Sequence, residues 1–317
     1  VGGTGGEPGA GGQSAGEVER GRYLVNHVAA CIDCHTPRLA DGSLDQSRLL
    51  SGNPSFTDLV PEDDEAGLVP APNLTPDETG LLAWSDDEIK NAFLNGVARS
   101  GEPLAPIMPY YVFHNMTDED ADAIVSYLRS LPATENEIPE RQPLPFPLDE
   151  PAAPVPADRI PDTTLDPSDP SYARAQNGRY LAGFIGTCME CHTAQAPITS
   201  AVPIDVDRLF AGGRIFDAAG LNLPVPPFPV EIVSPNITPD ETGIADLTPQ
   251  HIVTELLQGI EADGTRLCPP MPAGPMMAFG GLTESDAADI GIYLTTIPPV
   301  ESDAFPACTP PEEGPGG

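Results

Sequence analysis

The sequence predicts an all-α protein made of two tandem helical domains with long irregular loops. One observation behind this prediction is an internal duplication: "GRYLVNHVAACIDCHT" at 21–36 is matched by "GRYLAGFIGTCMECHT" at 178–193, which is 157 positions later. The other is that apolar residues recur at helical spacing in segments that open with helix-capping residues. Little of the chain alternates as a β-strand would.

Two further repeats extend the duplication over most of the chain. "PNLTPDETG" at 72–80 returns as "PNITPDETG" at 235–243, and "TDEDADAIVSYLRSLP" at 117–132 returns as "TESDAADIGIYLTTIP" at 283–298. The sequence therefore predicts two homologous units. Their expected boundaries are a flexible Gly-rich tether at 1–16, an N-terminal domain at 17–135, a proline-rich linker at 136–170, a C-terminal domain at 171–309 and a disordered tail at 310–317.

The first and last helices of each unit are predicted from the repeats. The opening helix covers 18–28 in the first unit and 172–185 in the second, and it delivers two cysteines at its C-terminal end. The closing helix begins after Thr117 in the first unit and after Thr283 in the second, because each threonine is a good N-cap for the apolar periodicity that follows.

A middle helix is predicted between them. In the first unit it begins after Ser85, and Glu88 three residues later completes a capping box. In the second unit it begins after Thr248, with Pro249 at the first helical position. The segments between the three helices are rich in glycine and proline, so we expect long loops there.

The charge of the chain restricts its partners. With 48 acidic and 14 basic residues the net charge is −34, which excludes a basic face for a nucleic-acid backbone. It favours a protein partner with a basic docking surface, although a solvated acidic coat explains it equally well. Since no stretch resembles a membrane helix or a signal peptide, we expect a chain whose targeting segment has been removed; a lipid anchor before residue 1 stays open.

The predicted helices alone bury little apolar surface. Aromatic residues make up only 6% of the chain, and each unit of about 120 to 140 residues contains much irregular loop. A large apolar cofactor would fill the centre of such a unit.

The two cysteine motifs predict which cofactor this is. Cys-x-x-Cys-His is the attachment pattern of c-type haem: the thiols add across the two vinyl groups, and the adjacent histidine reaches the iron. A redox dithiol is disfavoured because the flanking sequence has no βαβ pattern, and a zinc site because each unit lacks a second ligand pair. The predicted haem-binding residues are Cys31, Cys34 and His35 in the first unit, and Cys188, Cys191 and His192 in the second.

The second axial ligand should occupy the same column in both units. Only Met108 and Met271 do so, and each is followed by a proline. The alternative is that they fill the core, and Met276 and Met277 compete with Met271 on its longer loop. The remaining candidates have no matching partner or a different expected role; they are His27, His114, His251, Met116 and Met189.

Other singular residues have weaker interpretations. Cys268 and Cys308 are expected to form a disulfide if the compartment is oxidising, and otherwise remain free thiols. Asn73 and its repeat Asn236 suggest an Asx or Ser/Thr turn, either at the haem edge or purely structural. Trp84 is expected to pack, although its indole N–H could reach a haem propionate.

With these motifs in place, the chain resembles di-haem cytochromes c made of two fused class I domains. It is most similar to cytochrome subunits that accept electrons from periplasmic dehydrogenases; "PNITPDETG", "AGG" at 211–213 and "PPMP" at 269–272 are typical of that group. The resemblance implies two haems, one held by Cys31, Cys34, His35 and Met108, the other by Cys188, Cys191, His192 and Met271. Those subunits usually carry a third haem domain and a membrane-attaching segment, which this sequence does not show.

Electron transfer outside the cytoplasm is the function that these features favour. Iron with histidine on one side and methionine on the other need not change ligands as it cycles. A di-haem peroxidase is the alternative, and it requires a labile ligand at one iron, for example through movement of the Met271 loop. An extracellular conduit or filament is a third hypothesis, and it requires closely stacked haems.

Overall fold

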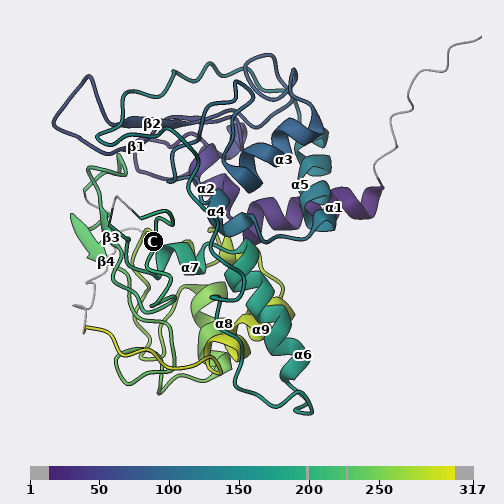
Figure 1. Cartoon of the computed structure of the whole chain (residues 1–317), viewed down its shortest axis with the longest axis vertical. Helices are drawn as coiled ribbons and strands as arrows, with labels where there is room; N and C mark the ends of the chain where they lie inside the picture. The colour runs from purple at the N-terminus through teal and green to yellow at the C-terminus, as the bar shows by residue number, and fades with distance from the viewer. Residues whose placement is uncertain (1–13, 198–199, 226–227, 304–317) are drawn as a thin grey trace, which may run out of the picture.

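The computed structural model describes residues 14–197, 200–225 and 228–303. Most of the predicted tether and the whole predicted tail lie outside these ranges. We refer to 14–135 as the N-terminal half and to 171–303 as the C-terminal half. In Figure 1 the first half occupies the upper part of the view and the second the lower part. No helix in the described ranges is both long and apolar enough to cross a membrane.

Helices dominate both halves, and the opening, motif, middle and closing helices follow one another in the same order in each. The N-terminal half contains α1 (Ala15–Tyr23), η1 (Leu24–Val28), α2 (Cys31–His35), η2 (Gln46–Arg48), α3 (Asp86–Asn95), α4 (Tyr110–Phe113) and α5 (Asp118–Ser130). The C-terminal half contains α6 (Tyr172–Tyr180), η3 (Leu181–Ile185), α7 (Cys188–Cys191), α8 (Pro249–Gln258), η4 (Phe279–Gly281) and α9 (Glu284–Leu294).

Each opening helix ends in a π-helical turn. The main-chain N–H of Ala29 donates to Leu24 O at 2.8 Å, and that of Gly186 donates to Leu181 O at 2.7 Å. Both are bonds across five residues, which are rare and often found beside functional sites. The first opening helix also begins earlier than predicted, because Ser14 accepts a capping hydrogen bond from the N–H of Glu17.

A glycine lets each opening helix cross its closing helix in close contact. A β-carbon at Gly21 would lie 1.8 Å from Ala123 O, and one at Gly178 would lie 2.0 Å from Asp289 O. No side chain fits there. The two glycines occupy the same column of the duplication, so this crossing is built in the same way in both halves.

The predicted caps of the other helices are confirmed. Ser85 and Glu88 form a capping box at the start of α3, and Thr117 accepts from the N–H of Asp120 at the start of α5. At the start of α8, Thr248 forms a capping box with His251, whose ring nitrogen accepts from the N–H of Thr248 at 3.2 Å.

The predicted helical class is confirmed, and the long loop of each half also contains two short antiparallel strands that were not predicted. β1 (Asn53–Asp58) pairs with β2 (Leu68–Ala71), and β3 (Ile215–Asp217) pairs with β4 (Glu231–Val233). Strands of three to six residues are too short for alternation to be recognised in a sequence. β1 packs against α2, and both ribbons lie on the left of the view in Figure 1.

The core is larger than the composition predicts. One cluster of buried apolar residues runs through both halves, so the halves supply apolar surface to each other. The proline-rich segment at 136–170 also contributes: Val155 and Ile160 are buried, and the N–H of Val155 donates to Tyr111 O at 2.9 Å. Part of this segment is therefore packed against the core.

Two equivalent tyrosines join the halves reciprocally. Tyr23 of α1 donates to Oδ2 of Asp286 at 2.6 Å and accepts from the N–H of Thr283 at 3.2 Å, at the start of α9. Its repeat, Tyr180 of α6, donates to Oδ2 of Asp120 at 2.9 Å and accepts from the N–H of Thr117 at 3.1 Å, at the start of α5. Each opening helix thus holds the N-terminus of the other half's closing helix.

Candidate functional site

The cysteines of both motifs lie on short helices, α2 and α7, that follow the π-helical turns. All four thiols are free, so neither pair forms a disulfide. Burial raises the pKa of Cys31 to about 12 and that of Cys188 to about 11. Burial likewise raises the pKa of Cys34 and Cys191. Redox-active cysteines need a lowered pKa, so these pairs do not have the properties of a redox dithiol.

The two motif histidines have the same environment. His35 and His192 are buried, and Nδ1 of each lies 2.9 Å from a proline carbonyl, that of Pro72 and Pro235 respectively. A carbonyl can only accept, so Nδ1 carries the proton and the lone pair of the neutral ring is on Nε2. Burial also lowers the pKa of both histidines, which favours the neutral ring. Each ring is oriented and protonated as an iron ligand requires.

The repeated "PN(L/I)TPDETG" run holds these proline carbonyls in place. Oδ1 of Asn73 accepts from the N–H and the hydroxyl of Thr75, at 2.9 and 2.8 Å, which forms an Asx turn. Its amide group donates to Thr134 O at 2.8 Å, beyond the end of α5. Asn236 makes the same contacts with Thr238 and Val300. The predicted turn is confirmed, and it directly follows the proline that orients the histidine.

A second support comes from the threonine after each histidine. The hydroxyl of Thr36 accepts from the N–H of Leu50 at 3.1 Å, and that of Thr193 accepts from the N–H of Phe210 at 3.0 Å. Leu50 and Phe210 both have positive φ, 60° and 66°, which is rare for large side chains. Strain retained at the same place in both halves indicates that the backbone around the histidines is held there by its surroundings.

Sequence reasoning missed Pro72, Pro235, Thr36 and Thr193 as functional residues. The signal was present, because all four lie within the longest identical repeats. The sequence could not show which partner each of these residues would meet, because each one acts through a single carbonyl or hydroxyl group that bonds to a residue distant in the sequence.

The two predicted methionine ligands are both half-buried against the core. The N–H of Met108 donates to Ala105 O at 3.1 Å, and that of Met271 donates to Cys268 O at 3.2 Å, so the two turns match. Met276 is 86% exposed, which makes it a poor rival to Met271 for a buried iron. Iron ligation by either methionine stays a prediction.

The other histidines and methionines have structural roles. His27 donates to Ala278 O at 2.9 Å and so joins the halves, and Nδ1 of His114 lies 3.0 Å from the Asn95 side chain. His251 caps α8, as described above. Met116 and Met189 are buried in the core.

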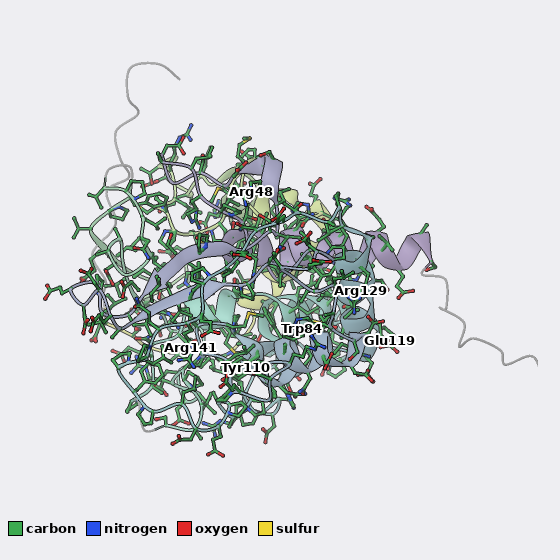
Figure 2. The ribbon with its side chains drawn as sticks, turned by 90° about the horizontal axis from the view of Figure 1, so that it is seen from above. Arg48, Trp84, Tyr110, Glu119, Arg129 and Arg141 are labelled. Atoms are coloured by element: carbon green, nitrogen blue, oxygen red, sulfur yellow. The ribbon has the colours of Figure 1, made fainter. Side chains whose placement is uncertain are left out.

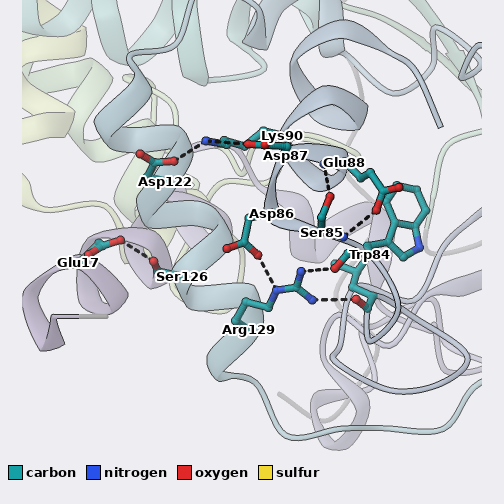
Figure 3. Close-up of polar contacts among 11 residues, drawn as sticks. Glu17, Trp84, Ser85, Asp86, Asp87, Glu88, Lys90, Asp122, Ser126 and Arg129 are labelled. Atoms are coloured by element: carbon teal, nitrogen blue, oxygen red, sulfur yellow. Dashed lines mark hydrogen bonds and ion pairs between the residues drawn. The ribbon is translucent and has the colours of Figure 1, made fainter. Parts of the chain in front are cut away.

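Trp84 packs beside the closing helix of its half. Arg129 of α5 donates to Trp84 O and, at 2.8 Å, to Leu81 O, and it pairs with Asp86 at 2.9 Å (Figure 3). Arg129 and Trp84 lie on the same side of the molecule in the orthogonal view (Figure 2). The arginine thus ties α5 to the start of α3, and the half-buried indole of Trp84 packs against the core.

Cys268 is buried and disulfide-bonded. Its predicted partner Cys308 lies outside the described residues, so the pairing itself stays a prediction.

The acidic residue inside each motif has different partners in the two halves. Both carboxylate oxygens of Asp33 are buried without a hydrogen-bond donor among the described residues, and burial raises its pKa to about 6. Glu190 occupies the same column and pairs with Arg214 at 2.6 Å, with both side chains buried. The Cys191 thiol donates to Oε2 of Glu190 at 3.2 Å.

These residues fit a covalently bound haem. Each half offers two free thiols three residues apart and one neutral histidine whose Nε2 is hydrogen-bonded to no described residue. Among the described residues, no three His, Cys, Asp or Glu side chains gather as a metal-ion site would require. The zinc alternative therefore has no ligand set in this part of the chain.

Comparison with known proteins agrees with this chemistry. Residues 18–132 match the family described as Cytochrome c. The gluconate 2-dehydrogenase cytochrome c subunit of Pantoea cypripedii is 31% identical over 56% of this chain and 38% of its own length. A diheme cytochrome c-type protein of Cereibacter sphaeroides is 37% identical over 39% of this chain and 38% of its own length.

A third relative extends over nearly the whole chain. The cytochrome c subunit of alcohol dehydrogenase (quinone) from Gluconacetobacter polyoxogenes is 28% identical over 89% of this chain and 56% of its own length. The chain thus spans 38% to 56% of the length of these three relatives. The similarity to cytochrome subunits of dehydrogenases is confirmed.

Proposed function

We propose that this chain is a di-haem electron carrier, a proposal supported by the match of residues 18–132 to the family described as Cytochrome c. In this proposal both halves are class I cytochrome c domains. Cys31, Cys34, His35 and Met108 hold one haem, and Cys188, Cys191, His192 and Met271 hold the other. When bound, haem c supplies an iron that accepts and releases one electron at a time.

The matched histidine geometry carries this proposal. In both halves a buried imidazole donates Nδ1–H to a proline carbonyl at 2.9 Å and presents Nε2 as a base. Such a hydrogen bond fixes the ring and increases its basicity toward a metal. A duplicated hydrogen bond of this kind, directly behind two free cysteines, is hard to explain by packing alone.

The chain's own residues also suit the transfer of electrons without a chemical reaction on a substrate. The cysteines hold the cofactor covalently, so its edge can face a partner without risk of loss. The supporting turns at Asn73 and Asn236 tie each histidine to the segment beyond its closing helix, which limits movement between redox states. Small movement favours fast exchange of electrons.

We infer that the chain serves as the cytochrome subunit of a dehydrogenase, on the outer side of a bacterial membrane. Two of the relatives are named as cytochrome c subunits of dehydrogenases, and haem attachment of this type takes place outside the cytoplasm. The net charge of −34 favours a partner with a basic docking surface. The dehydrogenase itself would supply the catalysis.

Carbon monoxide binding distinguishes a carrier from a peroxidase. In the fully reduced haem-loaded protein we expect no carbon monoxide complex, because His and Met fill both axial positions. Met108→Ala and Met271→Ala should each create one binding site. Stoichiometric binding to the unmodified protein would contradict the carrier assignment and favour an enzyme with one labile ligand.

A further inference from the structure

The most unusual charged group of the molecule is the Glu190–Arg214 pair. The two side chains are 8% and 7% exposed, and their closest atoms, Oε1 and Nη1, are 2.6 Å apart. Buried ion pairs cost free energy to desolvate, so they are seldom kept for stability alone. This pair also lies inside the haem-binding motif, since Glu190 precedes Cys191 and its Oε2 lies 3.2 Å from Sγ of that cysteine.

Arg214 is held rigidly where it meets Glu190. Its main-chain N–H donates to the hydroxyl of Ser234 at 3.0 Å, and its carbonyl accepts from the N–H of Ser234 at 2.8 Å. Its guanidinium carbon lies 5.4 Å from the ring centre of Phe216, in cation–π contact. The charge therefore has a fixed position beside the motif.

The N-terminal half has no counterpart of this arginine. The N–H groups of Gly52 and Gly212 donate to the carbonyls of His35 and His192 respectively, which aligns the two loops. Two residues after Gly212 stands Arg214, whereas two residues after Gly52 stands Pro54. Asp33, the counterpart of Glu190, consequently has no donor for its carboxylate within the described part of the chain.

The guanidinium of Arg38 does not replace Arg214. Its two hydrogen bonds go to main-chain carbonyls, to Asp33 O at 3.0 Å and to Gly42 O at 2.9 Å. The carboxylate in the first motif thus has no hydrogen-bond donor among the described residues, and only the nearby charge of Arg38 acts to lower its pKa. The carboxylate in the second motif is neutralised by a direct ion pair with an arginine.

We propose that Arg214, by cancelling the charge of Glu190 beside Cys191, makes the second haem site the one with the higher reduction potential. The inference rests on the proposed function. A ferric site carries one more positive charge than a ferrous site, so a nearby unpaired carboxylate favours the ferric state and lowers the potential. A buried low-dielectric setting makes this influence strong.

The pair also lies at the boundary between the halves. Tyr111 lies three residues after Met108 in the first half and is fully buried. Burial raises the pKa of Tyr111, the negative charge of Glu190 raises it further, and the positive charge of Arg214 lowers it. The same glutamate contributes to the raised pKa of Cys34, after burial and the larger effect of Asp33. The pair therefore lies close enough to the first half to act on buried groups there.

The test uses the full-length haem-loaded protein and a spectroelectrochemical titration. Glu190→Gln leaves Arg214 uncompensated and should raise the higher of the two midpoint potentials. Arg214→Gln leaves Glu190 uncompensated and should lower that same potential. We expect each shift to be about tenfold in the reduction equilibrium constant, which is about 59 mV for one electron. The double variant should return close to the original value.

Controls separate charge from structure. If Arg214→Gln does not fold, Glu190→Gln and the double variant still decide, because they have the same carboxamide at 190 and differ only in the arginine charge. Asp122→Asn, which breaks the exposed pair with Lys90, should move neither potential.

The inference is overturned if both single variants shift the potential in one direction, if neither shifts it, or if the lower potential is the one that moves. Loss of two-haem stoichiometry in the unmodified protein would instead contradict the proposed function. The two failures are therefore distinguishable.

Discussion

The two halves of this chain share their scaffold and differ in their charges. Both cross their opening and closing helices at a glycine, orient a histidine with a proline carbonyl and fix that carbonyl with an Asx turn. In contrast, Asp33 is unpaired where Glu190 meets Arg214. The hydrogen bonds that hold a ligand ring have thus been kept through the duplication, while the charged groups around it have changed.

This comparison teaches which features serve the common chemistry and which adjust it. In the proposed haem sites a histidine that reaches iron would tolerate little change in its support, and the support is repeated almost residue for residue. A redox potential can vary, and buried charges are an effective way to vary it.

The largest expected loss of stability comes from substitutions where the opening and closing helices cross. Gly21→Ala and Gly178→Ala should each destabilise the protein by about 3 kcal/mol or more, because the new β-carbon would lie within 2.0 Å of a main-chain carbonyl oxygen. Chemical denaturation followed by circular dichroism measures this. Gly16→Ala is the matched control: it lies in the same helix as Gly21 with nothing within 4 Å of a β-carbon, and should change stability by less than about 1 kcal/mol. A similarly small loss at Gly178 would show that the second crossing is not built like the first.

A smaller effect is expected at the reciprocal tyrosines. Tyr23→Phe and Tyr180→Phe should each cost about 1 to 2 kcal/mol, because each removes a hydrogen bond to a carboxylate and leaves a main-chain N–H unpaired. Near-equal losses in thermal unfolding would support the symmetry of this interface. Tyr172→Phe, whose hydroxyl bonds to no described residue, should be neutral. A loss confined to one tyrosine would break the comparison.

The smallest expected effect depends on pH and on one half only. Burial raises the pKa of Glu255 in α8 to about 7, with the charge of Glu261 adding to it, whereas the matching column of α3 holds Ala92. The folded state therefore keeps this proton longer than the unfolded state does. Its stabilising contribution is complete below the ordinary pKa of 4.5 and is lost as the pH rises to about 7.

Glu255→Gln should accordingly make the protein about 1 kcal/mol more stable than the unmodified chain at pH 8, after allowance for the half-exposed position, and should remove this part of the pH dependence. Denaturation midpoints at pH 5 and pH 8 measure it. The exposed Glu241→Gln serves as control and should leave the pH profile as it was. An unchanged slope in Glu255→Gln would contradict the assignment.

The sequence predicted the helices well because their signals are local. Ser85 with Glu88, and Thr248 with Pro249, mark helix starts within four residues, and the structure begins α3 and α8 there. The strands were missed because their pairing joins distant short segments, as Asn53 with Ala71. The shared core was underestimated because composition does not say that two halves will pack together.

The candidate site was predicted as residues but not as geometry. The Cys-x-x-Cys-His pattern predicted the chemistry, since the spacing of the cysteines is itself what c-type haem attachment requires. The partners of those residues depend on tertiary contacts: His35 meets Pro72 across 37 positions, and Glu190 meets Arg214 across 24. No periodicity or spacing rule reveals such contacts, although duplication pointed to the segments that contain them.

The central claim is that both halves carry a haem bound through cysteine, and intact mass spectrometry tests it most directly. Protein matured in a host that attaches c-type haem should exceed the mass of the polypeptide by two haem groups. Cys31→Ala with Cys34→Ala, or Cys188→Ala with Cys191→Ala, should each remove one of them. The bare polypeptide mass, or a single haem in the unmodified chain, would contradict the account.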